Sequence, residues 1–175
     1  MDGHAGKLTR VGAIIYRAWD SSEVYVKPRL DSLLPHLIIE YSANIEDQIG
    51  LDALLDKLHT CALGTGVFPL GGLRVRAHRT DHFRIADKAK ENGFVHVTAL
   101  IGHGRALDVQ QRAGEQLFAA LTEHLGSLYD RSPLAISLNI QEFHPVLNFK
   151  KNNLHEHVKK RGKNGGATSQ SGGAK

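Results

Sequence analysis

Two arginines stand where secondary-structure elements are expected to begin, and arginine at such places can bind anions. Arg74 follows the loop FPLGG and opens an alternating segment, and Arg105 ends the turn GHGR just before an amphipathic stretch. A guanidinium group can hold a carboxylate through a forked pair of hydrogen bonds, and a helix N-terminus adds free N–H groups and a positive dipole end. A solvated or ion-paired arginine is the simpler explanation for either residue alone, and Arg76 and Arg79 are weaker candidates on the same segment.

Pro35 and the histidines carry less information in their spacing. Pro35 directly precedes the apolar run HLIIE, and proline is tolerated as the first residue of a strand. The candidates for acid–base or metal chemistry are five histidines: His36, His78, His82, His96 and His103. None of them has a zinc-binding spacing such as HExxH. His96 alternates with apolar neighbours, which favours a core histidine, and His155 and His157 have no further ligand nearby. We therefore expect no metal site.

Several other classes of protein are disfavoured by missing signals. The single cysteine, Cys61, cannot form an internal disulfide, and its apolar neighbours at helical spacing indicate a buried structural thiol. The sequence has no Walker loop, dinucleotide-binding fingerprint or GxSxG motif. It also has no run of about 18 apolar residues and no secretory signal, so we expect no membrane span and a cytoplasmic location.

The distribution of charge argues against nucleic-acid binding by the folded part of this 175-residue chain, whose formal net charge is +4. Residues 159–175 carry five Lys/Arg and no acidic residue, whereas residues 35–158 carry 12 Lys/Arg and 14 Asp/Glu. A nucleic-acid-binding fold would place its basic face on the folded part. The tail has no aromatic or large aliphatic side chain, so we expect residues 159–175 to be disordered.

Residues 35–158 are expected to form one domain in which a β-α-β unit occurs twice. Apolar runs and alternation predict strands, and apolar residues at helical spacing predict two helices, over His36–Tyr41, Leu51–Ala62, Leu73–Thr80, Phe94–Ile101, Leu107–His124 and Leu134–Ile140. Extra hairpin pieces are expected at Phe83–Ala86 and Phe143–Phe149. Right-handed β-α-β units place both helices on one face of the sheet. The other face then needs a cover, which oligomerisation would supply.

Residues 1–34 form an N-terminal extension with weak patterning. A short strand at Ala13–Tyr16 or Val24–Val26 fits the composition, but neither segment has an obvious partner. We expect this extension to be either disordered or the product of a wrongly assigned start.

Four sequence blocks carry a family resemblance: PHLIIEYSANIE, TGVFPLGGLRVRAH, FVHVTALIGHGR and HPVLNFKKNNLHEH. In order and spacing, over residues 35–158, they resemble the 5-carboxymethyl-2-hydroxymuconate isomerase family of the tautomerase superfamily. The resemblance implies an α/β (α+β) tautomerase fold, with two helices on one face of a four-stranded mixed sheet. It also implies a homotrimer that needs neither a metal nor an organic cofactor.

The same resemblance implies the site and its chemistry. An amino-terminal proline, which maps to Pro35, is the catalytic base, and Arg74 and Arg105 bind the substrate. The substrate is a 2-hydroxymuconate dienol with several carboxylates, formed in homoprotocatechuate degradation, and the product is its 2-oxo-3-ene isomer.

One departure from the family concerns the catalytic amine. The family proline is first in the mature chain, whereas 34 residues precede Pro35 here, and Leu34 stands where the initiator methionine would be. An amide nitrogen has no usable lone pair, whereas a free α-amine has a pKa of about 7.7–8.0, which a site of low dielectric with nearby arginines would lower. We therefore expect translation to start at Leu34, from a UUG or CUG codon with removal of the methionine, or else proteolytic maturation.

A second departure is Ala106, which cannot cap the following helix as Ser or Thr would. Three alternatives to the isomerase remain open. They are another tautomerase acting on phenylpyruvate-like enols, a non-catalytic anion-binding relative in which Pro35 is not N-terminal, and a nucleic-acid-binding sheet domain. The acidic domain and the lack of an aromatic strand motif disfavour the last.

Overall fold

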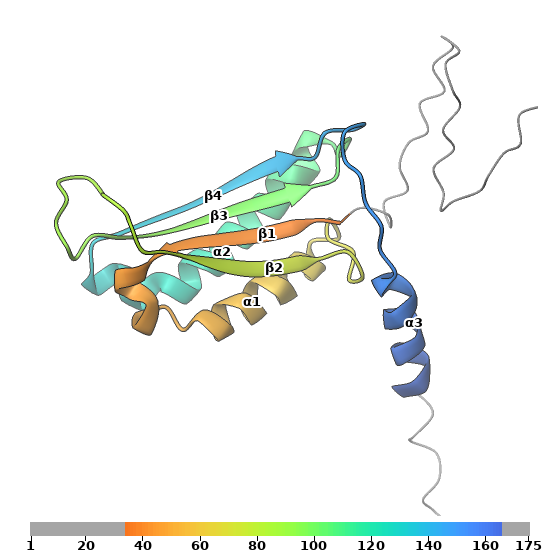
Figure 1. The fold of residues 1–175 in the computed structure, drawn as a ribbon, viewed down its shortest axis with the longest axis horizontal. Coiled ribbons are helices and arrows are strands. Elements are labelled where there is room, and N and C mark those ends of the chain that lie inside the picture. Colours follow the sequence, from red (N-terminus) through yellow and green to blue (C-terminus); the bar gives the residue numbers. More distant parts are fainter. Residues whose placement is uncertain (1–33, 166–175) are drawn as a thin grey trace, which may run out of the picture.

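The computed structural model describes residues 34–165, so the short strands expected at Ala13–Tyr16 or Val24–Val26 lie outside the described residues. The expected β-α-β order occurs twice (Figure 1). The elements are β1 (His36–Ser42), the 3-10 helix η2 (Ala43–Gln48), α1 (Leu51–Gly64), β2 (Arg74–Thr80), β3 (Gly93–Ile101), α2 (Leu107–Arg131), β4 (Leu134–Glu142) and α3 (Leu154–Gly165).

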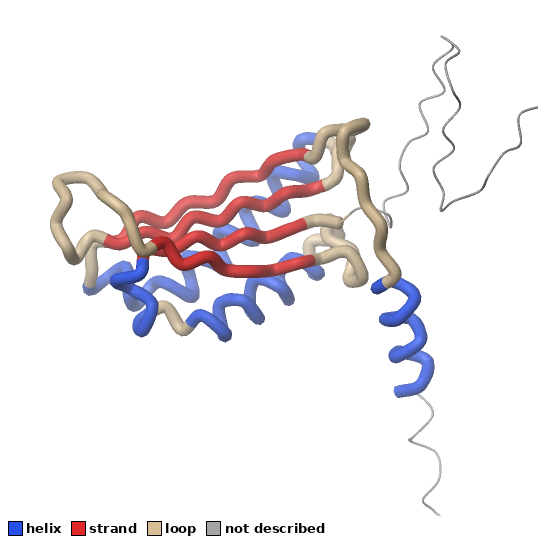
Figure 2. Tube along the Cα trace, in the orientation of Figure 1, coloured by secondary structure: helices blue, strands red, loops and turns tan. Residues whose placement is uncertain are grey.

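The sheet is mixed, as expected, with the strand order β2-β1-β3-β4. β1 is parallel to β2 and β3 is parallel to β4, whereas β1 and β3 run antiparallel in the centre. The two helices α1 and α2 lie together on one face of this sheet (Figure 2). Because of these directions, β1 and β2 begin at the same edge at which β3 and β4 end.

The core lies between the sheet and the two helices. Alternate residues of the central strand β3 are fully buried, as a half-covered strand requires: Val95, Val97, Ala99 and Ile101. Leu54 and Leu58 of α1, together with Leu117 and Leu121 of α2, pack in the same cluster and are also fully buried. Burying a side chain of this size stabilises a fold by about 1.5–3 kcal/mol, so the apolar stripes of the helices fix the position of the sheet.

The opposite face of the sheet, which we call the open face, carries no helix from the described residues (Figure 1). Its side chains are largely polar, and they include Arg74, Arg76 and His78 from β2. His36 of β1 pairs with Arg74 and shares this face.

The two expected hairpin pieces are wrong. Phe83–Ala86 lies in the loop between β2 and β3, where the Asn92 side chain donates to the carbonyl of Ile85 and to the carboxylate of Asp87. These local bonds make a turn in place of a ladder. Phe143–Phe149 is also irregular, and only its first residue continues the sheet, through a hydrogen bond of 2.8 Å from Phe143 N to Ile101 O.

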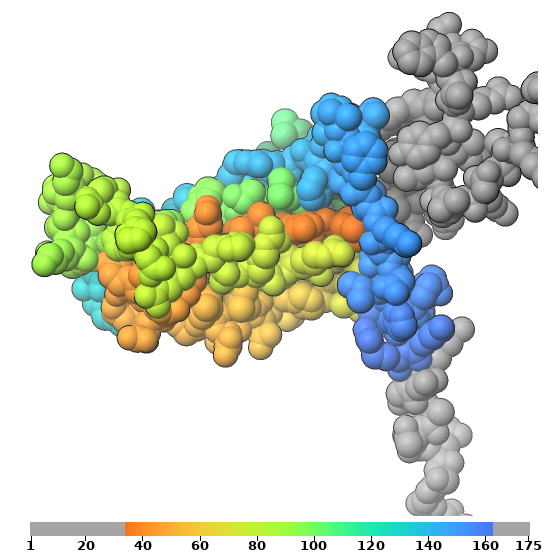
Figure 3. All heavy atoms as spheres, viewed as in Figure 1, coloured from red at the N-terminus to blue at the C-terminus, as the bar shows by residue number. Residues whose placement is uncertain are grey.

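A turn ends the pairing after Phe143. His144 Nδ1 accepts hydrogen bonds from the backbone N–H groups of Val146 and Leu147, at 3.2 and 2.9 Å. Pro145, which lies between His144 and Val146, has no N–H to donate to a β-ladder. The segment 143–153, which we call the C-terminal arm, therefore leaves β4 and runs down one end of the sheet to α3 (Figure 3).

The third helix, α3, was not expected, and it reaches Gly165, within the segment predicted to be disordered. Asn152 forms a turn just before its start, in which Asn152 Oδ1 accepts the backbone N–H of Leu154, the first residue of the helix, at 3.0 Å. The Asn152 side chain also donates to the carbonyl of Gly71 at 2.9 Å, which joins the helix start to the loop before β2. The expected helix over Leu107–His124 is seven residues longer, and Leu125 and Leu128 continue its buried stripe.

Within residues 34–165, no helix combines the length and apolar character needed to cross a membrane.

Candidate active site

The topology brings Pro35, Arg74 and Arg105 to one edge of the sheet, which we call the site edge. Arg74 N donates to the carbonyl of Pro35 at 3.1 Å, so the starts of β1 and β2 are joined there. His36 pairs with Leu100, which places Pro35 beside the C-terminal end of β3. Arg105 follows β3 after one short turn, and its guanidinium reaches back to the loop before β2.

Arg105 is held by backbone carbonyls and by no acidic side chain of the described residues. Its guanidinium donates to the carbonyls of Gly102 and Val67, each at 2.7 Å. Burial lowers the pKa of Arg105, and the nearby charge of Glu142 partly offsets this. A half-buried cation bound only to neutral acceptors keeps its charge available for an anionic ligand.

Arg74 is likewise bonded to a backbone carbonyl and to no acidic side chain of the described residues. It donates to the carbonyl of Gly72 at 3.0 Å and forms no ion pair within residues 34–165. Arg79, outside the site, differs because it is paired with Glu46 and with Asp81, the latter at 2.8 Å. Arg74 and Arg79 lie on one strand, but only Arg79 has its charge balanced by carboxylates of the described residues.

Arg112, a second arginine with an acidic partner, lies near the start of α2. It donates to Asp108 at 2.8 Å, and its side chain is 61% exposed. The ordinary ion-paired explanation therefore holds for Arg112 and not for Arg105, seven residues earlier.

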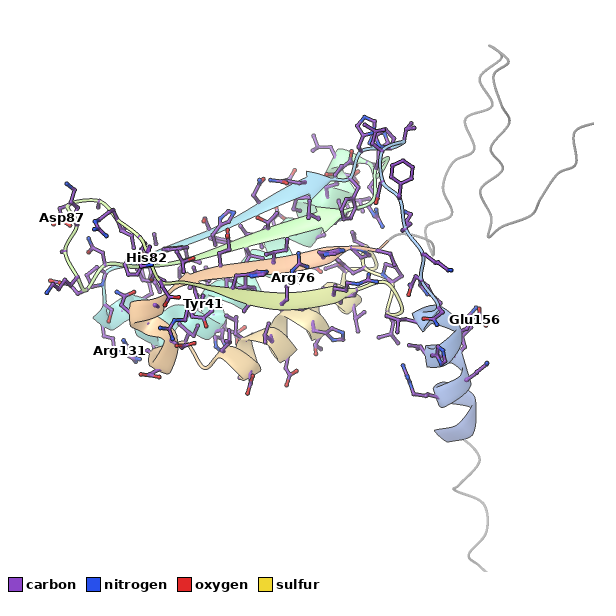
Figure 4. All side chains as sticks on the ribbon, in the orientation of Figure 1. Tyr41, Arg76, His82, Asp87, Arg131 and Glu156 are labelled. Atoms are coloured by element: carbon purple, nitrogen blue, oxygen red, sulfur yellow. The ribbon has the colours of Figure 1, made fainter. Side chains whose placement is uncertain are left out.

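A network beside Pro35 was missed by the sequence analysis, which ranked Arg76 low. Arg76 Nη1 donates to His36 Nδ1 at 2.7 Å, and Arg76 Nε donates to His78 Nε2 at 3.3 Å. The network lies on the open face, where Arg76 is seen on the side of the sheet facing the viewer (Figure 4). The two-residue spacing of Arg74, Arg76 and His78 is a signal that could have placed all three on one face.

The environment of His36 favours its neutral form. Burial lowers the pKa of His36, and the charges of Arg76 and Arg74 lower it further. Its ring also lies edge-on to Phe143 at the start of the C-terminal arm, with ring centroids 5.8 Å apart. His36 therefore links the residue after Pro35 to both the arginines and the arm.

Pro35 is buried, and in the 175-residue chain its nitrogen forms an amide with Leu34. In that form it can shape the strand start but cannot take up a proton, since an amide nitrogen has no basic lone pair. A chain beginning at Pro35 would instead present a secondary amine at the same edge as two unpaired guanidinium groups.

The remaining candidates do not converge on the site edge. His96 lies on the open face and not in the core, with its Nδ1 2.7 Å from the Ser137 hydroxyl. His82 is exposed at the opposite end of the sheet (Figure 4). Cys61 is half-buried and donates to the carbonyl of Gln116 at 3.5 Å. No group of three or more metal-ligating side chains occurs in the described part of the chain.

Comparison with known proteins identifies the family of this chain. The family model described as 5-carboxymethyl-2-hydroxymuconate isomerase matches residues 35–158. This chain belongs to that family. It is therefore an isomerase, and the match begins at Pro35 itself.

A curated relative and two solved structures agree with the family. The 5-carboxymethyl-2-hydroxymuconate Delta-isomerase of Escherichia coli is 43% identical over 122 residues, which cover 70% of this chain and 97% of the relative. A crystal structure of a 5-carboxymethyl-2-hydroxymuconate isomerase from Deinococcus radiodurans R1 is 36% identical, with a TM-score of 0.67, and covers 71% of this chain and 94% of its own. A 5-carboxymethyl-2-hydroxymuconate delta-isomerase structure has 28% identity and a TM-score of 0.66, over 81% and 96% of the two chains.

More distant structures share the fold alone. A fused 4-OT symmetric trimer is 18% identical with a TM-score of 0.50, over 67% of this chain and 94% of its own. The expected tautomerase fold is thus confirmed for the family member described here.

Proposed function

We propose that this isomerase converts 5-carboxymethyl-2-hydroxymuconate to its 2-oxo-3-ene isomer, in homoprotocatechuate catabolism, with the amine of Pro35 as the base. The observation that carries the proposal is that Pro35 shares the site edge with two arginines, Arg74 and Arg105, that are held by carbonyls and bear no carboxylate partner among the described residues. Such a site suits a substrate with more than one carboxylate. The name of the Escherichia coli relative supports the same substrate.

The proposed reaction is a proton transfer between two positions of the substrate. Arg74 and Arg105 hold the carboxylates, and one of them polarises the 2-oxygen as it becomes a carbonyl. The Pro35 amine takes the proton of the 2-hydroxyl group, and a proton returns to the far carbon of the diene, so that no atom or electron is gained or lost. A positioned base typically contributes about 10²–10⁴-fold, and orientation of the bound substrate supplies much of the rest.

The base requires a Pro35 that carries no acyl group. A free α-amine has a pKa of about 7.7–8.0, and burial beside two guanidinium groups would lower it toward neutrality, where a general base works best. Initiation at Leu34 followed by loss of methionine would produce this amine, as would proteolysis before Pro35.

The test compares two forms of the protein under one assay. We expect a chain that begins at Pro35 to isomerise 5-carboxymethyl-2-hydroxymuconate and the full 175-residue chain to be inactive, with the dienol followed by its ultraviolet absorbance. Mass spectrometry of the native protein should then find Pro35 as its first residue. Equal activity in a full chain shown to be intact would refute the amine mechanism, and a preference for phenylpyruvate enol would point to the other tautomerase activity.

We further propose that the active form is a homotrimer. The open face of the sheet lacks a cover from the described residues, and the C-terminal arm exposes Val146, Leu147 and Phe149 at 68–79%. Exposed apolar side chains grouped in this way are typical of an interface. Sedimentation equilibrium should give three times the monomer mass, and a monomeric mass at micromolar concentration would refute the proposal.

A further inference from the structure

Glu142, the last residue of β4, binds the turn that carries Arg105. Glu142 Oε1 accepts the backbone N–H of Gly104 at 3.1 Å and the side-chain amide of Gln110 at 3.0 Å. Glu142 Oε2 lies 2.9 Å from His103 Nδ1. Two of these contacts, to His103 and Gly104, fall within the connection from β3 to α2, and the third reaches Gln110 in the first turn of α2, so one carboxylate joins the turn to the helix that follows it.

Apart from Glu142, the Arg105 side chain also bridges this turn, through its hydrogen bond to the carbonyl of Gly102. Gly104 has a φ of +91°, a conformation that residues with a Cβ rarely adopt. Ala106 is the N-cap residue of α2 and provides no side-chain hydrogen bond, as expected from its side chain. The Glu142 carboxylate binds the backbone N–H of Gly104, two residues before this N-cap, and Gln110 extends the contact by donating to the carbonyl of Arg105 at 2.9 Å.

Glu142 does not bond the Arg105 guanidinium itself, which donates to Gly102 and Val67. A direct ion pair would neutralise the cation, whereas a carboxylate occupied by the turn fixes the backbone of Arg105 and leaves its guanidinium free for the ligand. His103 balances part of the carboxylate charge when it is protonated, and the Glu142 side chain is only 27% exposed.

We propose that Glu142 is a positioning residue that holds the 102–105 turn so that Arg105 is ready to bind a substrate carboxylate. The proposal rests on the proposed function, in which Arg105 binds substrate. It predicts that Glu142 acts on substrate affinity through Arg105 and has little effect on the proton-transfer step.

The test is a double-mutant cycle on the active form of the enzyme. We expect Glu142→Ala to raise KM for 5-carboxymethyl-2-hydroxymuconate about tenfold, equivalent to about 1.4 kcal/mol, with kcat changed less than about threefold. In an Arg105→Ala background the same change should have no further effect on KM, because its effect passes through the missing side chain. Glu142→Gln, which can still accept from Gly104 N, should lie between Glu142→Ala and the wild type.

A matched control removes a carboxylate elsewhere. Glu123→Ala eliminates an exposed glutamate of α2 that pairs with Lys57 at 3.0 Å, and KM should not change. Additive effects of Glu142→Ala and Arg105→Ala would overturn the proposal, since a general loss of stability would act in both backgrounds. An unchanged KM in Glu142→Ala would overturn it as well.

Binding without turnover separates this proposal from the proposed function. Tricarballylate, a saturated tricarboxylate, is titrated into the wild type and the same variants in a calorimeter. If the wild type binds it, with coupling between Glu142 and Arg105, but does not turn over the dienol, the isomerase proposal fails and the role of Glu142 stands. If the wild type turns over the dienol and Glu142→Ala leaves both KM and tricarballylate affinity unchanged, only the role of Glu142 fails, and absence of both binding and turnover overturns both.

Discussion

Replacing Gly71 by alanine tests how the C-terminal arm is fixed to the site edge. A Cβ built at Gly71 would lie 2.4 Å from Nδ1, 2.8 Å from Cγ and 2.9 Å from Cα of His155, at the start of α3. These distances are too short for any carbon contact, and the Cα of His155 is backbone that cannot rotate away. Either α3 moves or the loop before β2 does.

The expected loss in unfolding free energy has two parts. Overpacking of a filled site costs about 1–3 kcal/mol. The hydrogen bond from Asn152 to the carbonyl of Gly71 adds about 1 kcal/mol if it breaks. Because α3 can come away from the loop, the loss is limited to the docking free energy of the arm, and we expect about 2 kcal/mol in total.

Urea unfolding and limited proteolysis measure this effect. Gly71→Ala should lower the unfolding free energy and expose the chain between residues 143 and 165 to trypsin, while the rest stays folded. Gly126→Ala is the matched control, because no atom lies within 4 Å of the added Cβ and alanine in a helix interior is about 1 kcal/mol more favourable than glycine. If Gly71→Ala matches the wild type in stability and in cleavage of the arm, α3 is not docked as described.

Three further predictions concern single side chains. Arg105→Ala should lower kcat/KM about 100-fold, because two hydrogen bonds from a cation to a carboxylate are lost, whereas Arg112→Ala should change it less than about twofold; equal effects would remove Arg105 from the site. His36 has its pKa lowered from 6.5, so the folded chain should lose stability as the pH falls from about 7.5 to about 5.5, and urea unfolding should show a smaller loss in His36→Gln. Burial raises the pKa of the Cys61 thiol, so iodoacetamide should label it more slowly in the native chain than in urea at about pH 8, and equal rates would contradict its burial.

The main elements were predictable because their signals are local. The alternation of Phe94–Ile101 matches the buried pattern of β3, and the apolar stripe from Leu51 matches α1. The hairpin expected at Phe83–Ala86 is wrong because bonds from the Asn92 side chain close a local turn there. Helix α3 was missed because the turn just before it is formed by Asn152, whose other contact lies 81 residues away at Gly71.

In the candidate site too, local features could be predicted from the sequence and contacts between distant residues could not. The sequence indicated Arg74 and Arg105 from their places at the ends of elements, but it could not show that their guanidinium groups are bound only by carbonyls. Arg76 was ranked low because its partner His36 lies 40 residues away. Glu142 escaped notice because it contacts a turn 38 residues earlier in the chain, and nothing in its neighbours marks it.

The loop between β2 and β3, residues 81–92, lies at the end of the sheet opposite the site edge. Figure 4 shows Asp87 there, far from Glu156 of α3. Asn44 of η2 anchors only the return of the loop, by donating to the carbonyls of Lys90 and Asn92 at 3.0 Å each. An insertion at the tip near Asp87 would disturb the local hydrogen bond from Asn92 but leave the chemistry at the other end of the strands unchanged, so a peptide tag or a fluorescent reporter can be grafted there.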